Sequence, residues 1–137
     1  MKFEIPQIWC ERINAGDLEG VLSLYEETAL LLGTFDAQPL DLPAQRRKYF
    51  ENLLNRPCSG VEIDEASLTY SRHSEGVYQA TGLYTFFCED DDVLVRQPAR
   101  FTFIVSVDER PLILHHHSSL VPNPASQIMT LPSTIPE

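Results

Sequence analysis

The chain of 137 residues has the length of one domain, and its 43% hydrophobic and 22% charged residues are typical of a globular protein. Ten basic against twenty acidic residues give a net charge of −10, which disfavours binding to nucleic-acid phosphates. No apolar run approaches the roughly 18–20 residues of a membrane-spanning helix, and no secretory signal is recognisable at the start of the chain. We therefore expect a cytoplasmic protein without nucleic-acid or membrane partners.

Two short helices are predicted first. An apolar stripe at helical spacing, which includes Trp9 and Ile13, indicates a helix that ends at Gly16. Asp17 can cap a second helix by accepting backbone N–H bonds. The apolar face of this second helix runs through residues 18–25. Together the two helices are expected to form a helical hairpin.

The next segment predicts a strand, a loop and a third helix. Residues 29–35 are a short apolar run typical of a buried strand, and residues 36–43 contain two prolines and indicate a loop. Residues 44–55 carry an apolar face at helical spacing, and the charged side chains that fill much of the remaining surface include Arg46 and Arg47.

Beyond Gly60 the apolar pattern changes to period two, which is typical of strands. We expect four antiparallel strands, the third interrupted near Pro98, at residues 61–73, 77–88, 93–107 and 112–121. Helices followed by an antiparallel meander predict an α+β fold, with the N-terminal helices packed on one face of a curved antiparallel sheet.

The strand over residues 100–107 has two different faces, because side chains alternate along a strand. The odd positions are all apolar: Phe101, Phe103, Val105 and Val107. The even positions are mixed: Arg100, Thr102, Ile104 and Ser106. We expect a second subunit to cover the apolar face, with about 6–10 kcal/mol from four buried side chains. The mixed face is then expected to line a partly polar cavity.

Four stretches together resemble a known superfamily: residues 15–18 (AGDL), 48–53 (KYFENL), 99–103 (ARFTF) and 113–119 (ILHHHSS). They look like a nuclear-transport-factor-2-like (SnoaL-like) domain. Within it the chain most resembles the association domain of calcium/calmodulin-dependent protein kinase II and its stand-alone bacterial relatives. The resemblance implies a cone-like fold that encloses a pocket and a homodimer paired through the outer sheet face, with assembly into a higher ring as a further possibility.

The similarity covers nearly all of residues 1–122, which we expect to form one domain. No kinase segment is expected, since the chain starts at the first helix. Residues 123–137 are rich in proline and are predicted to leave the sheet and run extended over the surface.

The resemblance also implies a ligand pocket. Its arginines are matched by Arg47 alone, and Leu83, Thr102 and Ser118 stand at the other positions; Arg100, on the same strand face as Thr102, can substitute. Because a buried guanidinium needs a partner, Arg100 meets either an internal acceptor or a ligand with a carboxylate or another anion. A small polar or anionic ligand is therefore expected to contact Arg47, Tyr84, Arg100, Thr102, His116 and Ser118.

The histidine run 115–117 suggests two further roles. His115 and His117 share a strand face and could chelate a metal, but a zinc site needs three or four ligands, so neither a metal nor another cofactor is predicted. The resemblance turns His116 inward, beside Ser118. If the protein is an enzyme of the SnoaL-like kind (a cyclase, isomerase or oxidoreductase), His116 is the expected acid or base. No other catalytic residue is predicted.

Overall fold

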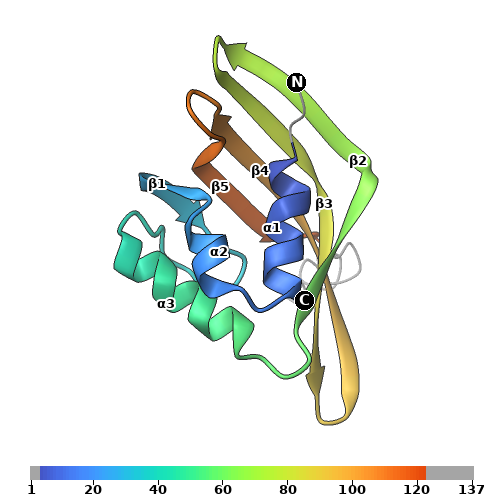
Figure 1. Cartoon of the computed structure of the whole chain (residues 1–137). Helices are drawn as coiled ribbons and strands as arrows, with labels where there is room; N and C mark the ends of the chain where they lie inside the picture. Colours follow the sequence, from blue (N-terminus) through green and yellow to red (C-terminus); the bar gives the residue numbers. More distant parts are fainter. Residues whose placement is uncertain (1–3, 123–137) are drawn as a thin grey trace, which may run out of the picture.

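Three helices and five strands follow one another in residues 4–122, the part of the chain that the computed structural model describes (Figure 1). The predicted proline-rich segment, residues 123–137, lies outside it. The helices are α1 (Ile5–Asn14), α2 (Leu18–Leu22) and α3 (Pro43–Leu54). The strands are β1 (Tyr25–Leu32), β2 (Gly60–Ser74), β3 (Val77–Asp90), β4 (Val93–Ser106) and β5 (Leu112–Leu120). No helix in residues 4–122 is both long and apolar enough to cross a membrane.

The sheet has the strand order β1-β5-β4-β3-β2, and the three helices lie against one of its faces (Figure 1). The predicted α+β class, with helices on a curved antiparallel sheet, is confirmed. One edge differs from a pure meander, because β1 pairs with β5 in parallel. β2 is sharply bent, and its pairing with β3 is irregular between Asp64 and Thr69.

The turn between the first two helices forms as its residues predict. Gly16 has φ +68, a left-handed conformation that favours glycine, and the Asp17 side chain accepts a hydrogen bond of 2.9 Å from the Gly20 amide. The second helix is shorter than predicted. It ends at Leu22, and Tyr25 begins β1 instead of completing a helical face.

The predicted interruption of the strand at Pro98 is wrong. β4 is continuous from Val93 to Ser106, and Pro98 pairs with Thr85 of β3. Proline removes a backbone donor, which matters only where a neighbouring strand needs it. On its other side, Pro98 lies just past the last β4–β5 pair, where its carbonyl accepts a hydrogen bond of 2.9 Å from the Val121 amide.

The predicted orientation of the two faces of β4 is also wrong. The apolar residues Phe101, Phe103 and Val105 are at most 2% exposed and lie on the helix side of the sheet. The mixed face, with Arg100 and Thr102, is the outer one. The apolar stripes of the helices need an apolar partner, and only this strand face supplies one without burying an unpaired guanidinium.

Aromatic side chains fill the space between the helices and the sheet. Trp9 of α1 stacks on Tyr84 of β3 with ring centroids 5.4 Å apart, and Tyr84 stacks on Phe101 at 4.5 Å. Phe103 stacks on His116 at 4.1 Å. These five side chains are at most 2% exposed. The inner face is therefore packed solid at these positions. The mixed face does border a hollow, but on the outer side of the sheet, where a pocket of about 240 Å³ is lined by Thr81, Arg100, Phe101, Thr102, His117 and Ser119.

Candidate functional site

A chain of buried hydrogen bonds runs through this aromatic core. Trp9 Nε1 donates to the Tyr25 hydroxyl at 3.1 Å, and the same hydroxyl oxygen lies 2.7 Å from His116 Nδ1. On the other side of the ring, His116 Nε2 lies 3.1 Å from the Tyr84 hydroxyl. The Tyr84 hydroxyl uses its proton on Ser118 and so accepts from Nε2; neutral His116 then carries its proton on Nε2 and accepts from the Tyr25 hydroxyl at Nδ1.

The chain continues from Tyr84 towards the surface. Its hydroxyl donates a bond of 2.7 Å to Ser118 Oγ, which in turn is hydrogen-bonded to Thr34. Ser118 is 5% exposed and Thr34 is half-buried. Tyr84, His116 and Ser118, three of the predicted ligand residues, are thus brought together. Their polar atoms bind one another within the core.

The environment of His116 suits a structural role. Burial, with smaller contributions from His115 and His117, lowers the pKa of His116 from 6.5 to about 3. Burial also raises the pKa of Tyr25 and of Tyr84 well above 10. All three groups are neutral at pH 7 and hydrogen-bonded. A proton exchanged with a substrate would have to pass through a closed core, so this geometry does not favour an acid–base role for His116.

Two other predicted ligand residues lie on the opposite face of the sheet. Arg100 is exposed, pairs in register with Ser119 of β5, and donates through Nε to Ser119 Oγ at 3.2 Å. Thr102 pairs with His117. Because facing residues in register point to the same side, these four side chains share the outer face. They form no common site with Tyr84, His116 and Ser118.

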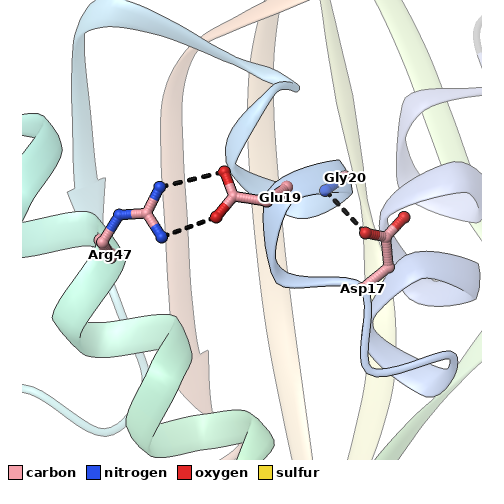
Figure 2. A network of polar contacts seen from close by, with 4 residues as sticks. All are labelled: Asp17, Glu19, Gly20 and Arg47. Atoms are coloured by element: carbon pink, nitrogen blue, oxygen red, sulfur yellow. Dashed lines mark hydrogen bonds and ion pairs between the residues drawn. The ribbon is translucent and has the colours of Figure 1, made fainter.

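The sixth predicted residue, Arg47, lies on the surface of α3 (Figure 2). Its two terminal nitrogens bind the carboxylate of Glu19 in α2 at 2.7 and 3.0 Å. The two side chains are 45% and 73% exposed, and the pair raises the pKa of Arg47 and lowers that of Glu19, chiefly by its hydrogen bonds. Arg47 thus ties two helices together at the surface.

The neighbouring arginine, Arg46, is the buried one, and the sequence analysis missed its role. Arg46 is 3% exposed and donates to three backbone carbonyls of β1: Ala29 at 2.7 Å, Glu27 at 2.9 Å and Glu26 at 3.2 Å. The signal was its spacing, because position 46 falls on the stripe of residues 49, 50 and 53 at i, i+3, i+4 and i+7. Arg46 thus joins α3 to the edge strand.

These two arginines give a matched prediction. Arg46→Ala is expected to lower the free energy of unfolding by about 2 kcal/mol, because it leaves buried carbonyls without a charged donor. Arg47→Ala is expected to lower it by less than about 1 kcal/mol, as for an exposed ion pair. Urea unfolding of the two variants measures both effects. Equal losses would contradict the structural role of Arg46.

A separate cavity lies between α3 and the loop that precedes it. It has a volume of about 610 Å³, and the described residues that line it all fall between positions 35 and 56. Its apolar lining consists of Phe35, Leu40, Ala44, Tyr49 and Leu53. The sequence analysis missed this cavity, because it assigned the pocket to the sheet. A pocket of this size and lining is the usual form of a small-molecule site.

The histidine run divides between the two faces of β5 as its alternation predicts. His115 and His117 pair with Ile104 and Thr102 on the outer face, and His116 pairs with Phe103 on the inner face. No group of three or more histidine, cysteine, aspartate or glutamate side chains in residues 4–122 is placed to hold a metal ion.

No family model matches the chain, and no curated protein matches it in sequence. Solved structures do match. A Xanthomonas campestris protein provisionally assigned as a calcium/calmodulin dependent protein kinase II association domain is 25% identical, with a TM-score of 0.78 over 88% of this chain and 85% of that one. An NTF2-like protein with a cystatin-like fold from Novosphingobium aromaticivorans is 10% identical, with a TM-score of 0.72 over 94% and 85%.

A ketosteroid isomerase-like protein from Erwinia carotovora atroseptica is also 10% identical, with a TM-score of 0.71 over 86% of this chain and 92% of that chain. The protein therefore has the nuclear-transport-factor-2-like, cystatin-like fold, as its sequence predicted. Among proteins of this fold, it resembles the Xanthomonas association-domain protein at a sequence identity of one residue in four.

Proposed function

We propose that the protein is a self-associating domain that forms a homodimer through the outer face of its sheet. Eleven side chains on this face, here called the outer patch, would form the interface. They are Leu30 and Leu32 of β1, Gln79, Thr81 and Leu83 of β3, Arg100, Thr102 and Ile104 of β4, and His115, His117 and Ser119 of β5.

The main support for the proposal is the filled interior of the molecule. In the described chain, the space between helices and sheet is occupied by Trp9, Tyr84 and the side chains around them, so the inner face serves folding. The outer face is the part of the sheet left over for a partner. A domain whose inner face only supports its fold is suited to association, which is also the role in the name of the Xanthomonas protein.

The composition of the outer patch supports the same function. Three of its four strands, β1, β3 and β4, contribute leucine or isoleucine side chains to the patch, and Leu83 is 42% exposed. The patch holds one arginine and two histidines but no carboxylate, although the chain carries a net charge of −10. Two copies can therefore meet over the patch itself without bringing acidic groups together, with Asp64 of β2, the register partner of Leu83, at its edge.

Ile104→Glu is expected to convert the dimer to a monomer. The side chain lies within the outer patch between His115 of β5 and Gln79 of β3, so each interface would bury two carboxylates, and the dissociation constant should rise at least about 100-fold. Light scattering during gel filtration measures the mass. Gln38→Glu adds the same charge on an exposed loop residue outside the outer patch and should leave the mass unchanged.

A mass of twice 15.6 kDa, or a larger even multiple for a ring of dimers, supports the proposal. A monomer at micromolar concentrations of the unmodified chain contradicts it, and so does an Ile104→Glu variant of unchanged mass. We also propose that this assembly is cytoplasmic, because all three cysteines (Cys10, Cys58 and Cys88) are unpaired thiols, as is usual in a reducing compartment.

A further inference from the structure

We propose that the cavity beside α3 binds a small organic acid with an apolar body, whose carboxylate is held by Lys48 and Arg56. This site goes beyond self-association. It belongs to the helix side of the molecule, whereas the outer patch lies on the opposite side of the sheet. It also shares no residue with the ligand site predicted from the sequence.

One wall of the cavity is built by the spacing of α3 and the residues that follow it. Ala44, Lys48, Asn52 and Arg56 recur every fourth residue and all line the cavity. Residues four apart lie on one side of a helix, one turn above another. Arg56 itself follows the end of α3 at Leu54 and lines the same cavity as Lys48.

The opposite wall is the loop that follows β1, and Tyr49 fixes its position. The Phe35 amide donates to the Tyr49 hydroxyl at 3.3 Å, and a Cβ at Gly33 would overlap the Tyr49 ring. Phe35 packs edge-on against Phe86 of the core with ring centroids 5.1 Å apart. Phe35 thus separates the cavity from the filled interior, and both walls are held by the fold before any ligand arrives.

The charges at the cavity define the ligand. Lys48 has no ion-pair or hydrogen-bond partner within residues 4–122. Arg56 uses only Nη2, which donates to Gln97 at 2.5 Å and to Cys88 Sγ at 2.8 Å, while its guanidinium lies 4.5 Å from the centre of the Phe35 ring. Its Nε and Nη1 donors have no hydrogen-bond partner among the described residues. Asp36 is the single carboxylate of the lining, so the cations outnumber it.

An anionic group next to an apolar body matches these features. A free N–H of the Arg56 guanidinium and the ammonium of Lys48 can each donate one charge-assisted hydrogen bond to a carboxylate. The aromatic and aliphatic side chains that face each other across the cavity would enclose a ring or short chain. The volume of about 610 Å³ falls within the roughly 300–1,000 Å³ of known small-molecule sites.

The test uses 1-naphthylacetate as the probe and its neutral analogue 2-(1-naphthyl)ethanol as the matched control. Nitrogen–proton correlation spectra of the full chain report both the affinity and the place of binding. We expect saturable binding of the acid, with the shifts confined to residues 35–56, and at least about tenfold weaker binding of the alcohol. Lys48→Gln should weaken binding of the acid about fivefold to tenfold, because the substitution removes one charged donor.

Two variants distinguish binding in the cavity from a general effect of charge or stability. Arg47→Gln removes a positive charge next to Lys48 but outside the cavity lining, and it should leave binding unchanged. Ala44→Trp, at an exposed position of the lining, should fill the cavity and abolish binding while the fold is kept. No saturable binding, equal binding of acid and alcohol, or unchanged binding in Lys48→Gln and Ala44→Trp would each overturn the proposal.

Failure of this proposal is distinguishable from failure of the proposed self-association. The mass of the assembly tests only the outer patch, and the naphthyl titration tests only the cavity beside α3. Because Ala44→Trp and Lys48→Gln change the helix side of the molecule, both variants should keep the mass of the unmodified chain.

Discussion

Replacing Trp9 with alanine is expected to lower the free energy of unfolding by about 3–5 kcal/mol, the usual cost of removing a large buried aromatic side chain. Trp9 is 1% exposed, stacks on Tyr84 and donates a hydrogen bond of 3.1 Å to Tyr25. The substitution opens a hollow between α1 and the sheet and removes one partner of the Tyr25 hydroxyl. Urea unfolding followed by circular dichroism measures the change.

Ile8→Ala is the matched control, because Ile8 precedes Trp9 on the same helix and is only half-buried. It should cost about 1 kcal/mol. Indole should stabilise Trp9→Ala but not the unmodified protein, since an apolar hollow binds a molecule of the shape that was removed. If Trp9→Ala cost no more than Ile8→Ala, the conclusion that Trp9 fills the cone would be contradicted.

Most of the fold follows from local patterns in the sequence. The four long strands, the third helix and the turn at Gly16 each rest on a periodicity or a residue that only one local structure accommodates well. The parallel pairing of β1 did not follow in this way. Residues 25–32 lie 80 or more positions before their partners in β5, and nothing local states which edge of the sheet a short apolar strand joins.

The orientation of the sheet could not be read from alternation alone. The pattern at residues 100–107 shows that one face is apolar and the other mixed, but not which of them meets the helices. The cost of burying Arg100 decides the matter, because the interior offers it no carboxylate, whereas Arg46 finds three carbonyls of β1. The predicted ligand site does not form for the same reason. Its sheet residues belong to both faces, with Arg100 and Thr102 on the outer face and His116 on the inner face.

The fully buried histidine gives the second large effect, a loss of stability in acid. In the folded protein, burial holds the pKa of His116 at about 3, whereas in the unfolded chain the ring titrates near 6.5. Between these values the unfolded state binds more protons, so the free energy of unfolding falls by about 1.4 kcal/mol per pH unit as the pH drops. Stability from this group is complete above pH 6.5 and decreases by roughly 4 kcal/mol towards pH 3.

His116→Gln isolates this contribution, because the variant keeps a donor and an acceptor between Tyr25 and Tyr84 but cannot take up the proton. At about pH 7 the variant should be less stable than the unmodified chain, since its amide fits the two hydroxyls less well. The difference should shrink by about 2–3 kcal/mol on going to about pH 4.5, as the unmodified chain alone bears the cost of neutral His116. The contributions of the acidic residues to the free energy of unfolding are the same in both proteins and cancel in the comparison. A difference independent of pH would mean that His116 is accessible to protons in the folded state, and it would contradict the conclusion that the core around His116 is closed.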